Sequence, residues 1–89
     1  MAEPYKTTSV WTSDRLPAGI RSAHSTKAGT WGLLNVLEGE VLLVFEDGSG
    51  NVRVTPGNPG LIPPEVLHHV EPAAGAKMQV EFYHENPLA

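Results

Sequence analysis

The residues best suited to chemistry lie at the end of a rigid segment, Pro56–Val70, which reads PGNPGLIPPEVLHHV. Glycines and prolines form a turn before a short apolar run, and Pro63-Pro64 then imposes an extended bend ahead of His68 and His69. Neutral imidazole binds metal ions and exchanges protons near neutral pH. Because the bend aims the following side chains in a fixed direction, we expect one imidazole to lie in the cavity of a small β-barrel.

The two adjacent histidines are predicted to face opposite sides of their strand. Side chains alternate along a strand, which groups His68 with Val66 and Val70 and groups His69 with Glu71. His68, between two valines, is therefore expected to point inward and His69 outward. Two interpretations of His68 remain open, a ligand in an apolar cavity or a buried histidine satisfied by a hydrogen bond.

Short strands joined by tight turns must position these residues. The nine glycines and eight prolines are spread between apolar runs, which is typical of many strands and turns, and no window has sustained helical periodicity. Gly-centred turns and the hairpin sequence VLEGEV at 36–41 favour a closed jelly-roll over an open sandwich, since closure removes exposed edges. We therefore expect an all-β, single-domain jelly-roll β-barrel, with strands at 7–11, 20–25, 31–37, 41–45, 51–55, 60–62, 67–70 and 77–84.

Composition limits the classes of partner. Eighty-nine residues suffice for one domain over 1–89, with a core of about 5–84, and so small a core favours a homodimer. The net charge of −4 and the scattered basic residues argue against nucleic acid. No apolar run reaches the roughly 20 residues of a membrane span, and Met1–Val10 lacks a secretory pattern. With no cysteine present, we predict a cytoplasmic protein.

The sequence also resembles a known family. VLEGE at 36–40, followed by PGNPGLIPPEVLHHV, resembles the two halves of the cupin signature. More narrowly, YKTTSVWTSDRLPAG (5–19), HSTKAGTWG (24–32) and IPPEVLHHVEP (62–72) look like the tellurite-resistance-associated small cupins of the YeaR/TehB-like family. This resemblance extends from Tyr5 to about Tyr83. It implies a cupin β-barrel, a divalent metal ion and dimerisation, in a domain found alone or ahead of a methyltransferase.

The resemblance implies a metal-ligand set. His68 matches the histidine of the second cupin motif, and His24 lies in the region of the first. The first motif usually has two histidines and a glutamate, but here it has only His24, and the glutamate position falls near Trp31 or Gly32. Glu81, in QVEFY, would complete a two-His-one-carboxylate site for Zn, Fe or Ni, and His69 is the other possible replacement.

The position of Glu81 is ambiguous. Met78, Val80 and Phe82 form the obvious core face of the last strand, so Glu81 and Tyr83 should point away from it. In a dimer both faces of this strand can be covered. Glu81 and Tyr83 would then face the cavity, whereas a monomer leaves Glu81 as a solvated carboxylate.

Two residues near His24 are candidates for binding a ligand. Trp31 would cap the barrel mouth and pack on a ligand, or else anchor its strand in the core. Lys27 would attract an oxyanion or a carboxylate, or else remain solvated. His84, close to the C-terminal ENPLA, is expected to be exposed.

Three functions follow from these residues. The first is a small metal-binding cupin acting in the response to tellurite-like oxyanions. The second is a metal-dependent cupin enzyme of the oxygenase or hydrolase type, so catalysis is left open. The third is a metal-free module that binds a small molecule in an apolar pocket or serves in assembly.

Overall fold

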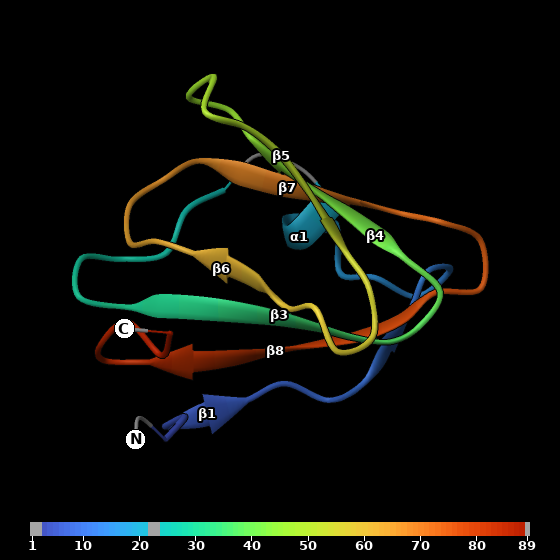
Figure 1. The fold of residues 1–89 in the computed structure, drawn as a ribbon, viewed down its shortest axis with the longest axis horizontal. Helices are drawn as coiled ribbons and strands as arrows, with labels where there is room; N and C mark the ends of the chain where they lie inside the picture. Colours follow the sequence, from blue (N-terminus) through green and yellow to red (C-terminus); the bar gives the residue numbers. More distant parts are fainter. Residues whose placement is uncertain (1–2, 22–23, 89) are drawn as a thin grey trace.

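Two antiparallel β-sheets face each other across a hydrophobic core in the computed structural model, which describes residues 3–21 and 24–88 (Figure 1). The first sheet has the order β1-β8-β3-β6, and β2 also pairs with β8. Its strands are β1 (Lys6–Thr7), β2 (Trp11–Thr12), β3 (Trp31–Glu38), β6 (Gly60–Ile62) and β8 (Lys77–Tyr83). The second sheet has the order β5-β4-β7, with β4 (Val41–Phe45), β5 (Gly50–Val54) and β7 (His68–Pro72).

The core forms where the alternating apolar faces of the two sheets meet. Leu34 and Met78 from the first sheet are fully buried against Leu43 and Val54 from the second. The sheets approach closely at Gly60, where an added Cβ would lie 2.7 Å from Cγ2 of Val54. A short helix, α1 (Ala18–Arg21), packs against β7 and closes one side of this core.

The expected closed jelly-roll barrel is wrong. A barrel needs a continuous hydrogen-bonded ladder around its circumference, but here the ladders are divided between a five-stranded and a three-stranded sheet. Turn spacing is the same in a sandwich and in a barrel, so the glycines and prolines predicted many strands without predicting their closure.

Two of the expected strands are also wrong. The segment 7–11 is split between β1 and β2, because Oγ1 of Thr8 accepts a hydrogen bond from the amide of Val80 at 3.0 Å and interrupts the regular ladder. The segment 20–25 begins in α1 and ends in a single β-bridge between His24 and His68, while residues 22 and 23 lie outside the described residues. The strands expected from 31 onward agree with β3 to β8 within a few residues.

In the described part of the chain, no helix is long and apolar enough to span a bilayer.

Candidate functional site

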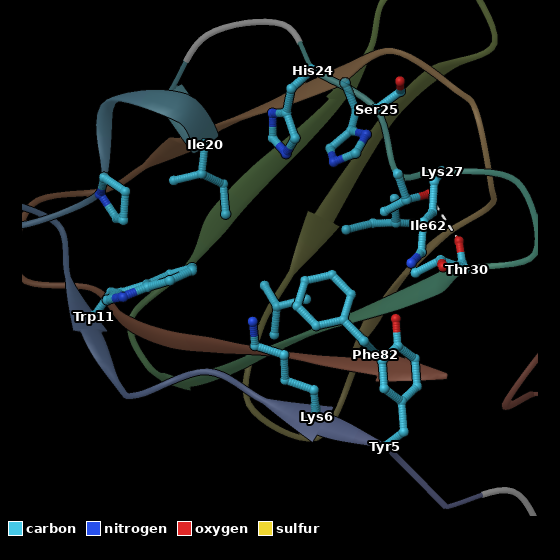
Figure 2. A pocket seen from close by; sticks show the side chains of 14 residues that line it. Tyr5, Lys6, Trp11, Ile20, His24, Ser25, Lys27, Thr30, Ile62 and Phe82 are labelled. Atoms are coloured by element: carbon cyan, nitrogen blue, oxygen red, sulfur yellow. Dashed lines mark hydrogen bonds between the residues drawn. The ribbon is translucent and has the colours of Figure 1, made fainter. Parts of the chain in front are cut away.

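A pocket of about 430 Å³ opens between the two sheets (Figure 2). Side chains from β1, β2, α1, β6, β7 and β8 line it together with the segment that precedes β3. The lining side chains near its floor are buried: Ile20, Thr30, Ile62, His68 and Val80. Others are more exposed and stand around its mouth: Tyr5, Lys6, Pro17, Ser25 and Lys27. The pocket floor is therefore mostly apolar, with Thr30 and His68 as its buried polar side chains, and the mouth carries polar side chains such as Lys6, Ser25 and Lys27.

Backbone pairing brings His24 and His68 together in this pocket. Each donates its amide hydrogen to the carbonyl oxygen of the other, at 2.9 Å and 2.8 Å. Their rings lie 4.3 Å apart between centroids and are tilted by 56°. The bend before His68 is held in place by Glu65, whose backbone has a φ of 63° and whose amide donates to the carbonyl oxygen of Thr26 at 3.0 Å.

His68 is a neutral, oriented imidazole. Only 2% of its surface is exposed, so it points inward as alternation predicts. Its Nδ1 lies 2.9 Å from the carbonyl oxygen of Val66, which can only accept, so Nδ1 carries the hydrogen and Nε2 is left as an acceptor. Burial lowers the pKa of His68, and the neighbouring His24 lowers it further against the opposing effect of the Val66 hydrogen bond.

His69 faces the other way and is engaged by two carboxylates. Its Nδ1 pairs with Glu46, and its Nε2 lies 2.7 Å from Oε2 of Glu71. Both contacts are satisfied together only when both ring nitrogens carry hydrogen. The hydrogen bond to Glu71, followed by that to Glu46, therefore raises the pKa of His69 above its ordinary value near 6.5.

Glu81 does not join the two histidines. On β8, Val80 and Phe82 line the pocket, so alternation places Glu81 on the opposite face of the sheet. There its Oε1 accepts a hydrogen bond from Nδ2 of Asn35 at 2.6 Å and one from the hydroxyl of Tyr83 at 3.3 Å. Burial and the nearby Glu81 charge raise the pKa of Tyr83.

Of the remaining candidate residues, one lines the pocket and the others lie outside it. Lys27 lines the pocket, and Figure 2 shows it extending inward from the segment before β3. Trp31 pairs with Tyr83 in the ladder between β3 and β8 and lies with it on the outer face. His84 is exposed and stacks on Tyr5 with ring centroids 3.9 Å apart.

Sequence reasoning missed several lining residues, above all Lys6, Trp11 and Phe82. The core-face pattern of the last strand identified Phe82 as inward without indicating a cavity beside it. No local signal in the sequence marks Lys6, because its place depends on the pairing of β1 with β8.

Comparison with known proteins places the domain in a family. Residues 6–80 match the profile of the TehB-like domain. The chain belongs to the TehB-like family. Two curated relatives, each called a probable S-adenosyl-L-methionine-dependent methyltransferase TehB, come from Haemophilus influenzae strains 10810 and KW20 / Rd. Each is 38% identical over 72 residues, which cover 75% of this chain and 25% of the relative, so this TehB-like chain spans about a quarter of their length.

Solved structures agree with the TehB-like assignment. The crystal structure of TehB from Haemophilus influenzae superposes with a TM-score of 0.78 at 33% identity, covering 91% of this chain and 30% of that one. A crystal structure of an Escherichia coli K12 protein superposes with a TM-score of 0.81 over 92% of this chain and 89% of its own. At 23% identity the second comparison shows the fold alone.

These findings correct several expectations. The TehB-like part of the resemblance is confirmed, but the cupin assignment is wrong, because the strands of the described residues form no closed barrel and the matching family and the TehB crystal structure are TehB-like. The metal-binding cupin function and the divalent metal cofactor are wrong as well. The relatives are named as S-adenosylmethionine-dependent methyltransferases, and residues 3–21 and 24–88 contain no group of three or more metal-ligating side chains placed to hold an ion.

Proposed function

We propose that this TehB-like domain binds a small organic molecule in the pocket between its sheets, within proteins that carry out methyl transfer from S-adenosylmethionine. The pocket itself supports the proposal most strongly. Its volume of about 430 Å³ falls in the range of ligand sites. It also combines an apolar floor with a few polar groups, which is the usual composition of such sites.

S-adenosylmethionine itself does not fit this pocket. Its sulfonium and α-ammonium groups outweigh its single carboxylate, so its net charge is positive at neutral pH, and carboxylates are the side chains that bind ribose hydroxyls in many nucleotide-binding folds. The described lining residues include Lys6 and Lys27 but neither Asp nor Glu. Two ammonium groups would repel the cofactor and no carboxylate would offset them. We therefore assign the pocket to a different molecule, such as a methyl acceptor or a regulatory ligand.

Titration of small aromatic compounds into ¹⁵N-labelled protein tests the proposal. Indole and 2-naphthamide are expected to cause saturable shifts of amide resonances that cluster at pocket residues such as Ile20, Lys27 and Ile62. Ser25→Phe, at the exposed mouth, should suppress these shifts. Ser49→Phe is the matched control, because Ser49 lies in an exposed turn outside the pocket and should leave binding unchanged. Shifts that are absent, or that persist fully in Ser25→Phe, contradict the proposal.

The homodimer and the cytoplasmic location remain predictions. Light scattering of the purified protein tests the first, and fractionation of expressing cells tests the second.

A further inference from the structure

Charge is distributed very unevenly between the pocket and the rest of the protein. The chain has ten acidic residues and a net charge of −4. Among the described residues that line the pocket, none is acidic, whereas two of the six Lys and Arg residues and two of the four histidines are present. An acidic protein thus has a pocket whose fixed charge is positive.

Neither lysine side chain in the pocket takes part in an ion pair found among the described residues. The ion pairs found among the described residues join Arg53 to Glu40, Lys77 to Glu38, and His69 to two glutamates, and they leave out Lys6 and Lys27. Figure 2 shows Lys6 rising into the pocket from β1 and Lys27 entering from the segment before β3. Two ammonium groups from separate elements therefore reach the same cavity without a carboxylate partner in the described structure.

The apolar side chains on the pocket floor favour a ligand that has a hydrocarbon body. Ile62 and Val80 are buried there, and the aromatic side chains of Trp11 and Phe82 add apolar surface. A small inorganic anion would remain hydrated and would leave this surface empty. A flat or branched hydrocarbon body would cover it, with a gain of roughly 25 cal/mol per Å² of apolar area removed from water.

We propose that the ligand of this pocket is a small organic acid, whose hydrocarbon body lies on the apolar floor and whose anionic group lies near Lys6 and Lys27 at the mouth. This inference rests on the proposed function and specifies its ligand class. An anion held by partly exposed lysines gains a modest amount from each, so each lysine should contribute a fewfold effect on affinity.

Three probes of matched shape test the charge preference. 2-Naphthoate, 2-naphthamide and 2-naphthylmethylammonium have nearly the same body and differ in charge. At low ionic strength we expect 2-naphthoate to bind about tenfold more tightly than 2-naphthamide, and the cation to bind most weakly. The advantage of 2-naphthoate should shrink as salt is raised, because screening weakens exposed charge pairs. Sulfate, which has charge without an apolar body, should bind at least about tenfold more weakly than 2-naphthoate.

Variants of the two pocket lysines test whether their side chains cause the preference for an anionic ligand. Lys6→Met and Lys27→Met should each lower 2-naphthoate affinity about threefold and leave 2-naphthamide affinity unchanged. Lys77→Met is the control, because Lys77 is paired with Glu38 at 2.9 Å and does not line the pocket. All three side chains are exposed, so the variants should remain folded.

The outcomes separate the two levels of the proposal. If 2-naphthamide or the cation binds the pocket as tightly as 2-naphthoate, or if Lys6→Met and Lys27→Met have no effect, the organic-acid assignment is overturned while ligand binding stands. If sulfate binds as tightly as 2-naphthoate, the ligand is an inorganic oxyanion and the assignment is also overturned. If none of the probes shifts the pocket amides, ligand binding itself fails.

Discussion

The close approach of the two sheets at Gly60 gives a quantitative test of how they pack. In Gly60→Ala, the added Cβ would lie 2.7 Å from Cγ2 of Val54 and 3.1 Å from Cδ2 of Leu43. Carbon atoms in contact are normally about 3.5–4.0 Å apart, so about 1 Å must be relieved between strands of different sheets. Overpacking of this kind costs about 1–3 kcal/mol in the free energy of unfolding. For a domain of this size, that lowers Tm by roughly 4–8 °C per kcal/mol.

A double-mutant cycle identifies the source of this cost. Val54→Ala alone removes two buried methyl groups and should cost about 2 kcal/mol. It also removes the Cγ2 atom that the new methyl group of Gly60→Ala would strike. The double variant should therefore be about 1–2 kcal/mol more stable than the sum of the two single effects predicts. Leu43 keeps the rescue incomplete, because its Cδ2 is unchanged.

Thermal and urea denaturation followed by circular dichroism measure all four proteins. Gly19→Ala is the matched control, because its methyl group meets nothing within 4 Å and alanine favours the helical backbone of α1. It should be neutral or stabilising by up to about 1 kcal/mol. Additive effects of Gly60→Ala and Val54→Ala, within about 0.5 kcal/mol, would show that the sheets do not meet as described.

Three other substitutions test single features. Since the folded pKa of His69 is raised above 6.5, its ion pairs stabilise the fold below pH 6.5 and are lost as pH rises through the folded pKa. His69→Gln should abolish this alkaline loss of about 0.5 kcal/mol in the free energy of unfolding, measured by denaturation at a series of pH values. An unchanged pH profile would refute this account of His69. Glu65→Gly should be neutral or stabilising by up to about 1 kcal/mol, because glycine adopts the positive φ of 63° at this position without the strain that glutamate experiences. A clear loss of stability would contradict backbone strain at this bend. Glu81→Gln should lower the pKa of Tyr83 in ultraviolet titration, yet keep it above 10.0 because burial is the larger cause. Naphthoate affinity should not change in Glu81→Gln, since Glu81 lies outside the pocket.

Local pattern predicted the strands after residue 31 because each has enough apolar residues, with turn signals at both ends, to define itself. Val41–Phe45 is the central strand of its sheet. An uninterrupted apolar run is typical of a strand buried on both faces, whereas Leu42 and Val44 in this strand are only half-buried. Before residue 31 the pattern failed, because strands of two residues have no periodicity to detect and Thr8 replaces a backbone partner with its hydroxyl group.

Alternation was the most reliable guide to the site. It placed His68 inward and indicated that Glu81 points away from the core face, and the structure shows both. The cupin resemblance implies the opposite position for Glu81, which requires a dimer that covers both faces of the strand. A two-residue period imposed by the backbone thus carried more information about this strand than the family pattern did.

Only part of the charge of the pocket could be predicted from local sequence, since Lys27 was a candidate for binding an anion and Lys6 was not. Lys6 reaches the pocket because β1 pairs with β8 in a register that sets Lys6 opposite Phe82, near the other end of the chain. Lys27 reaches it because the segment after His24 is tied to the bend at Glu65. Composition gives a net charge of −4, which suggests no affinity for anions. An anion-selective pocket in such a protein is a property of topology, since two distant lysines are brought to one cavity while the carboxylates lie elsewhere.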